Sequence, residues 1–385
     1  MTQEPIRDPL EKTMVIFGCD PEFFFEKKGK IIGSEKIINI EKGLKVVGGA
    51  AGKTGPSKFI VDGVQAELNP VPNTCRQSLA MEISRSFNQL YTELKKDKDL
   101  SINFAPTIKI TKEELISLDE RSRRFGCSPS KNTDTKHQNA ATLRDPAVYR
   151  YRSAGGHIHL GYYGDDNNSS SSQSKIIMRE PARLVQILDI IVGNTCVLID
   201  RDKGNIERRK VYGRAGEYRT PAHGVEYRTL SNFWLRSYPL MSFVFNLSRL
   251  AVSIMANSMP GRDYEKELLS LINIKDIQRA INSNNFLLAW NNFQKIKPFI
   301  ARVCTESGGF PLTANTLPTF EFFVSKGIDY WFKENPLEHW LKVPSGGSAY
   351  YGWEAYLSKV VTPEMMKQNP TPAPTMPITL TTTTW

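Results

Sequence analysis

The sequence predicts an α+β protein with a strand-rich N-terminal part and a mostly helical C-terminal part. In four segments with strand-like composition, two polar residues stand two positions apart, which places both side chains on one face of a strand. From Pro239 to about Val361, apolar residues instead recur every three to four positions, the period of an amphipathic helix. Strands that precede helices, rather than alternating with them, are typical of the α+β class.

The length of the chain allows one large domain or two ordinary ones. The chain has 385 residues, of which 40% are hydrophobic and 23% charged, as in soluble globular proteins. We expect one domain over residues 1–361, with its helical part at about 239–361. Residues 362–385 are rich in Pro and Thr, and this composition predicts a disordered tail or a docking peptide.

The charge indicates an anionic partner. The net charge is +10, which favours a nucleotide, a nucleic acid or an acidic peptide. The basic residues are spread along the chain, and the sequence has no basic helix interleaved with aromatic residues. Nucleic-acid binding is therefore disfavoured.

Cysteine usage and the N-terminus predict a cytoplasmic location. The five cysteines are scattered and form no C-x-x-C pair, which argues against a zinc ribbon or a disulfide scaffold and fits a reducing compartment. The charged N-terminus does not resemble a signal peptide. The longest apolar run that we recognise, Ile187–Ile199, is interrupted by polar residues and is too short to span a bilayer. We therefore expect no membrane partner.

The first expected strand, Met14–Phe25, carries the first polar pair. Asp20 and Glu22 lie on one face, and Phe23 and Phe25 take the opposite face, which we assign to the core.

The glycine-rich segment that follows is not a P-loop. Val47 stands where that motif needs its first glycine, and Pro56 blocks the helix that would bind the phosphate. We expect instead a flexible loop that offers Lys53 or Lys58 to a phosphate.

Strands and helices then follow one another up to residue 120. Phe59–Asn69 is expected as one strand, with Asp62, Gln65 and Glu67 as its polar residues. Helical spacing and a capping box predict two helices in the segment that comes after it. The further elements are a helix at Thr74–Lys95 capped by Asn73 or Thr74, a strand at Ser101–Ile110, and a helix at Thr111–Glu120 with a Thr111/Glu114 capping box.

The segment Tyr149–Tyr163 is expected as a strand with two histidines on one face. His157 and His159 stand two apart, between Gly155-Gly156 and Gly161. Glycines allow a ligand or another backbone to approach closely. A metal or a polyanion is one interpretation, and two solvent-facing histidines are the other.

The second information-rich region lies between a buried helix and the helical C-terminal part. Ile176–Asp200 is expected as one long buried helix. After it, Glu226 and Arg228 form the fourth polar pair, and Arg214 and Arg219 precede them on a glycine-punctuated loop. Taken alone, this pair is also compatible with a surface strand. We expect Arg208 and Arg209 to lie on a solvated face.

If the four polar pairs are neighbours in one sheet, they line a single face. That face combines carboxylates, two imidazoles and arginines, which suits Mg²⁺ or Mn²⁺ holding a nucleoside triphosphate. Arginine is suited to clamping a phosphoryl group as it is transferred.

Four motifs in this order resemble the phage-type carboxylate–amine ligases of the glutamine synthetase and glutamate–cysteine ligase superfamily. The resemblance covers roughly Val15 to Leu235. The motifs are GCDPE at Gly18–Glu22, DGVQAELN at Asp62–Asn69, GGHIHLG at Gly155–Gly161 and GVEYRTLSNFW at Gly224–Trp234.

The resemblance implies a fold, a reaction and a set of site residues. The fold would be a curved, mainly antiparallel sheet whose concave face is the active site, with helices on the other face. An acid would be phosphorylated by ATP, and an amine would attack the acyl phosphate to give an amide and ADP. Specificity would lie in loops such as Arg121–Asp145 and Gly164–Ser174. The implied metal ligands are Asp20, Glu22, Glu67, His157 and Glu226; the implied catalytic residues are Arg214, Arg219 and Arg228; and the expected nucleotide contacts are Lys53, Lys58, His159 and Arg152.

One departure concerns Asp20, where the superfamily usually has Glu. The shorter side chain makes direct metal contact by Asp20 a weaker expectation than contact by Glu22. We also divide the two histidines, with His157 on the metal or nucleotide and His159 on the substrate side.

The leading hypothesis is an ATP- and Mg²⁺-dependent (or Mn²⁺-dependent) ligase acting on an amino acid, a peptide or a protein. If the chain is encoded by a bacteriophage, it would work in the host cytoplasm. Two alternatives remain open: a phosphagen-type kinase of the same architecture, and a non-catalytic nucleotide- or peptide-binding protein associated with the virion.

Overall fold

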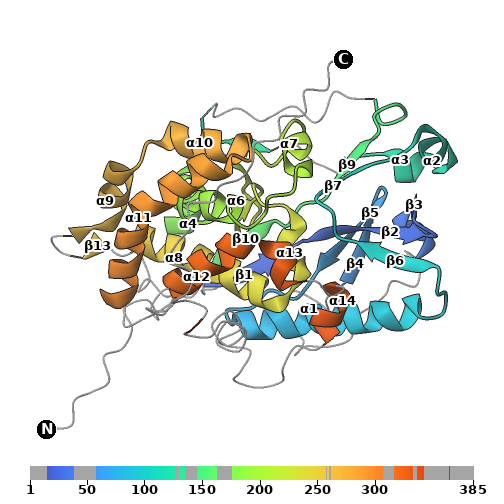
Figure 1. Ribbon diagram of the computed structural model, residues 1–385, viewed down its shortest axis with the longest axis horizontal. Coiled ribbons are helices and arrows are strands. Elements are labelled where there is room, and N and C mark those ends of the chain that lie inside the picture. Colours follow the sequence, from blue (N-terminus) through green and yellow to red (C-terminus); the bar gives the residue numbers. More distant parts are fainter. Residues whose placement is uncertain are drawn as a thin grey trace, which may run out of the picture.

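The structure, a computed structural model, confirms the predicted α+β class (Figure 1). Several predictions lie outside the described residues: the loop with Lys53, the polar loop 164–174 and, apart from residue 364, the tail. The structure describes residues 15–38, 58–125, 130–134, 145–162, 176–256, 258–259, 262–306, 316–332, 336–341 and 364.

The first sheet is antiparallel throughout. Its inner strands carry His159 and Glu226, and one edge strand, β1, is the first element of the described chain. In spatial order the strands are β1 (Val15–Cys19), β10 (Ile158–Tyr162), β12 (Gly224–Tyr227), β11 (Glu217–Arg219) and β8 (Lys131–Asn132).

The second sheet is built around β2 (Glu22–Lys27), which pairs antiparallel with three other strands. The partners of β2 are β3 (Lys30–Ile32), β5 (Gln65–Asn69) and β6 (Leu100–Asn103), and β4 (Lys58–Asp62) pairs with β5. A separate two-stranded ribbon consists of β7 (Thr107–Lys109) and β9 (Tyr151–Ser153).

The two sheets meet at Asp20 and Pro21. The expectation of one strand over Met14–Phe25 is wrong, because β1 and β2 belong to different sheets. Pro21 has no N–H to donate to a ladder, which favours a break at this point. The junction is nevertheless held on both sides: the Leu68 N–H donates to Pro21 O at 3.0 Å, and the Glu22 N–H donates to Gly155 O at 2.9 Å. The four polar pairs are therefore divided between two sheets.

Other expected strands are also interrupted. Phe59–Asn69 is a hairpin, in which β4 and β5 are joined by a tight turn. Gly63 adopts a φ of +60°, a conformation that an Asp-Gly turn supplies readily. Ser101–Ile110 divides into β6 and β7, and Tyr149–Tyr163 divides into β9 and β10.

Two predicted helices are confirmed. Helix α1 spans Arg76–Leu94, and Cys75 occupies its N-cap position. Asn73, one of the expected caps, accepts a hydrogen bond from the Cys75 N–H through its side-chain Oδ1. Helix α2 (Lys112–Ser117) begins with the predicted Thr111/Glu114 capping box, and the short helix α3 (Glu120–Arg123) follows.

The expected helix at Ile176–Asp200 is broken. Helix α4 (Ile176–Arg179) ends before Pro181, which occupies the first position of α5 (Pro181–Leu188), where its missing N–H costs nothing. A π-helical turn, η2 (Asp189–Gly193), then leads into α6 (Asn194–Val197).

The C-terminal part is helical as predicted, within the residues that the structure describes. Helix α8 (Tyr238–Ala256) is longer than the apolar run at Ile187–Ile199, and by length and composition it could cross a membrane. However, 94% of its apolar window is buried inside the protein, as in a core helix. The remaining helices are α7 (Gly204–Arg208), α9 (Tyr264–Leu271), α10 (Ile274–Asn282), α11 (Phe286–Glu306), α12 (Thr316–Lys326), α13 (Ile328–Trp331) and α14 (Pro336–Leu341).

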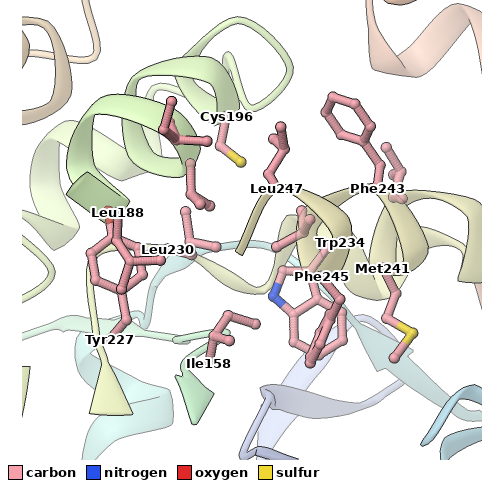
Figure 2. Close-up of a cluster of buried hydrophobic side chains, with 14 of the residues drawn as sticks. Ile158, Leu188, Cys196, Tyr227, Leu230, Trp234, Met241, Phe243, Phe245 and Leu247 are labelled. Atoms are coloured by element: carbon pink, nitrogen blue, oxygen red, sulfur yellow. The ribbon is translucent and has the colours of Figure 1, made fainter. Parts of the chain in front are cut away.

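The hydrophobic core packs against one face of the first sheet. Ile158 on β10 lies on the side of Trp234 and Phe245, whereas Tyr227 on β12 lies beside Leu188 of α5 (Figure 2), and all four side chains are buried. Burying side chains of this size contributes about 1.5–3 kcal/mol each. Because strand residues alternate, this packing commits His159 and Glu226 to the opposite face of the sheet.

Candidate metal centre

Strand register places the predicted residues of the first sheet in one row. His159 on β10 faces Gly18 on β1 and Glu226 on β12, and Glu226 also faces Arg219 on β11. A Cβ at Gly18 would lie 3.3 Å from the Cβ of His159, so the glycine gives the imidazole room. The sheet therefore brings an imidazole, a carboxylate and a guanidinium side by side.

Asp20 completes the first group of ligands, which we call the imidazole cluster (Asp20, His157, His159 and Glu226). Donor atoms of Asp20, His159 and Glu226 lie within 4.8 Å of one another. Asp20 Oδ1 is 3.1 Å from His157 Nδ1, and Asp20 Oδ2 is 3.2 Å from His159 Nε2. His157 Nδ1 is also 3.5 Å from Glu226 Oε1.

The buried ligand atoms of the imidazole cluster fit a cation. Among the described residues, Asp20 Oδ1, both ring nitrogens of His157 and His159 Nε2 are buried without a well-formed hydrogen bond. Such atoms normally find a partner, and a divalent ion would supply one. Burial opposes ionisation of Asp20, but the two imidazoles outweigh it and lower the pKa of the carboxyl.

The second group, the carboxylate cluster, consists of Glu22, Asp62 and Glu67. Their oxygens also lie within 4.8 Å of one another. Glu22 and Glu67 are directly opposite on β2 and β5, where like charges destabilise a sheet. A divalent cation would relieve that repulsion. Asp62 was not among our predicted site residues, although the Asp62-Gly63 turn signal was present in the sequence.

Burial and mutual repulsion raise the pKa values of this cluster. Burial first, and then the charges of Asp20 and Glu22, raise the pKa of Glu67 to about 9. Burial, Glu22 and Asp20 likewise raise the pKa of Asp62 to about 7. Asp20, a member of the imidazole cluster, is thus among the charges that raise the pKa of Glu67.

The metal-free protein is expected to lose stability as the pH rises from about 4.5 to about 9. In this window the folded protein keeps a proton on Glu67 that the unfolded chain releases, so each pH unit favours unfolding by up to about 1.4 kcal/mol. Asp62 acts in the same direction. Urea unfolding in the presence of EDTA measures the effect. Unfolding free energies that stay constant between about pH 5 and pH 8 would contradict it.

Two of the predicted arginines contact the imidazole cluster. Arg219 Nη2 donates to Glu226 Oε1 at 2.5 Å, and Arg228 Nε lies 3.1 Å from the same oxygen. The Arg228 side chain is 2% exposed and that of Arg219 is 32% exposed, so Arg219 is the one that solvent or a ligand can reach. Arg214 is exposed and stands between Gly213 and Gly216, both of which have a positive φ.

The residues that we predicted to contact the nucleotide lie in different environments. The Arg152 guanidinium donates to the carbonyls of Tyr149, Tyr151, Arg123 and Pro146, so its donors hold the fold together and we do not retain it as a nucleotide contact. Lys58 is the first residue of β4, opposite Asn69. His159 lies inside the imidazole cluster, in contact with Asp20, and is not set apart from His157 as we expected.

His223 is a site residue that the sequence did not reveal. Its ring stacks on that of His159, with centroids 5.2 Å apart, and its Nε2 lies 3.0 Å from His159 Nδ1. The residue is exposed on the turn that leads into β12. A hydrogen bond to the second nitrogen of a ligating histidine fixes its orientation and tautomer.

Comparison with known protein families gives one match. Residues 135–271 match the family described as phage phiEco32-like COOH.NH2 ligase-type 2. Over this segment the chain is similar to that family. The matched segment contributes the histidines, Glu226 and both contacting arginines, while β1, β2 and the β4–β5 hairpin bring the remaining carboxylates from outside it. No curated protein matches the chain significantly.

Proposed function

We propose that the protein is an ATP- and Mg²⁺-dependent (or Mn²⁺-dependent) ligase that joins a carboxylate to an amine through an acyl phosphate. The observation that carries the proposal is the pair of ligand clusters at the junction of two sheets, with Arg219 and Arg228 beside Glu226. The family description, a carboxylate–amine ligase, supports the same reaction class. The wider relationship to glutamine synthetase stays a prediction.

The ligands of the two clusters suit different tasks. The carboxylate cluster offers only hard oxygens, which favour Mg²⁺, whereas the imidazole cluster adds nitrogen donors, which also suit Mn²⁺. When bound, such cations neutralise phosphate oxygens and orient a nucleoside triphosphate.

Arg219 and Arg228 supply the positive side chains of the site. Burial opposes the charge of Arg219, but Glu226, Asp20 and Glu67 outweigh it and raise the pKa of the guanidinium. The guanidinium of Arg219 therefore interacts electrostatically with carboxylates of both clusters. Because its side chain is also partly exposed to solvent, it can stabilise a phosphoryl group during transfer. Arg228 is buried and holds the Glu226 carboxylate in position.

The reaction balances in two steps. An oxygen of the acid attacks the γ-phosphorus of ATP, and ADP leaves. The nitrogen of the amine then attacks the acyl carbon, phosphate leaves, and the amine loses a proton. The acid and the amine are each an amino acid, a peptide or a protein side chain, and the reaction takes place in the cytoplasm, which is that of the host if a phage encodes the chain.

Hydroxylamine trapping tests this function even while the natural amine is unidentified. Pools of amino acids and peptides are incubated with ATP, Mg²⁺ and hydroxylamine, and ADP and hydroxamate are expected to form in equal amounts. The exposed Glu113 on α2 provides a matched control, since Glu113→Gln is expected to keep full activity.

Two results would overturn the proposal. A stable phosphorylated guanidine formed without hydroxamate would indicate a kinase. Tight ATP binding without ADP release from any pool would indicate a nucleotide-binding protein that is not an enzyme.

A further inference from the structure

Tyr212 is a buried residue that contacts one ligand of each cluster. It is 6% exposed and follows helix α7, in a segment where the sequence favours a solvated face for Arg208 and Arg209. That expectation is wrong, because the two arginines are 0% and 7% exposed. The turn that carries Tyr212 is therefore part of the interior.

The hydroxyl of Tyr212 holds a ligand of the carboxylate cluster. It donates to Glu22 Oε2 at 3.0 Å, and the Gly155 N–H donates to the same oxygen at 2.6 Å. The Glu22 backbone is fixed as well, since Asn232 Nδ2 donates to Glu22 O at 2.9 Å. Two donors on one carboxylate oxygen restrict its rotation, as do the outer hydrogen bonds around metal ligands in general.

The ring of Tyr212 holds a ligand of the imidazole cluster. It meets the His157 imidazole edge to face, with centroids 5.9 Å apart and planes at 71°. The same ring carries the Arg228 guanidinium at 5.4 Å from its centroid. Through these contacts it supports both His157 and the arginine that holds Glu226.

The ring itself is fixed from behind. The Arg208 guanidinium packs 4.6 Å from the ring centroid and donates to the carbonyls of Arg228, Thr229 and Leu230. Gly213 follows with a φ of +78°, and a Cβ there would lie 2.3 Å from Arg208 Nη1. The local backbone therefore leaves Tyr212 one position.

We propose that Tyr212 is a positioning residue that holds one ligand of each cluster, Glu22 and His157, and so keeps the two clusters in register. This proposal rests on the metal centre assigned above. Its two halves are separable, because the hydroxyl serves Glu22 and the ring serves His157.

Mn²⁺ titration of the nucleotide-free protein tests the proposal without any turnover. Calorimetry of the wild type is expected to resolve two classes of site, which Glu67→Gln and His159→Gln identify as the carboxylate and imidazole clusters. Tyr212→Phe is expected to weaken Mn²⁺ binding about 10- to 100-fold at the first class and less than about twofold at the second. Tyr212→Leu is expected to weaken both.

The controls separate positioning from a general loss of structure. Tyr91→Phe on helix α1 is the matched control and is expected to change neither class. If Tyr212→Leu does not fold, Tyr212→Phe decides alone. Unchanged Mn²⁺ affinities in Tyr212→Phe, or equal weakening of both classes, would overturn the role of Tyr212. A wild-type protein that binds no Mn²⁺ would overturn the metal centre and this proposal together.

Discussion

Replacing Glu67 by glutamine is expected to lower ADP formation by about 100- to 1,000-fold and to stabilise the metal-free protein. Glutamine keeps the acceptor for Asn69 Nδ2, which bonds Glu67 Oε1 at 2.5 Å, but it removes one charge from the carboxylate cluster. A bound cation loses a ligand charge, whereas the metal-free variant avoids the free-energy cost of keeping a proton on this side chain at neutral pH. Function and stability therefore move in opposite directions.

The gain in stability follows from the pKa of Glu67. Because that pKa is raised from 4.5 to about 9, the native protein at neutral pH carries a free-energy cost that glutamine avoids, on the order of 3 kcal/mol. Urea unfolding in EDTA measures the gain in the free energy of unfolding. In the variant, most of the decrease of that free energy between about pH 5 and pH 8 should also disappear. Glu113→Gln serves as the surface control. A Glu67→Gln protein with wild-type ADP formation would rule out the carboxylate cluster as a catalytic metal site.

Local signals predicted part of the fold well. The capping box of Thr111 and Glu114 and the apolar spacing of α1 are properties of a few neighbouring residues, so the sequence is sufficient to locate these helices. The spacing of two also placed His159 and Glu226 correctly on the polar face of their strands.

Long-range pairing accounts for what the sequence could not predict. Asp20 lies at a junction of two sheets, a position that depends on which strands β1 and β2 pair with and not on their own residues. Asp62 joins Glu67 because a turn folds β4 back on β5. Arg152 suits a nucleotide by its chemistry alone, and only the carbonyls around it show that its donors are already used.

Tertiary contacts also explain why Tyr212 and His223 were missed. Neither residue belongs to a polar pair with a spacing of two, the pattern on which the sequence argument relied. Each acts through a neighbour that is distant in the chain: Tyr212 through Glu22 and His223 through His159. Residues that orient ligands have no spacing of their own, because any element that reaches the ligand can supply them.

Replacing Arg228 by methionine is expected to lower the free energy of unfolding by about 3 kcal/mol. The guanidinium is 2% exposed and lies 3.1 Å from Glu226 Oε1, and its removal leaves a buried carboxylate with less compensation. Arg219 and His157 remain nearby, so the protein should still fold. Urea unfolding at neutral pH measures the loss.

A double-mutant cycle distinguishes a lost ion pair from lost packing. If Arg228→Met acts by exposing the charge of Glu226, then Glu226→Gln combined with it should be less destabilising than the sum of the two single changes by about 1–3 kcal/mol. Arg279→Met on helix α10 is the surface comparison, since its partner Asp276 forms an exposed pair expected to contribute less than about 1 kcal/mol. Strictly additive effects at Arg228 and Glu226 would mean that the arginine acts through its packing on Tyr212. In that case the carboxylate would be held mainly by Arg219, the arginine that also faces the open side of the site.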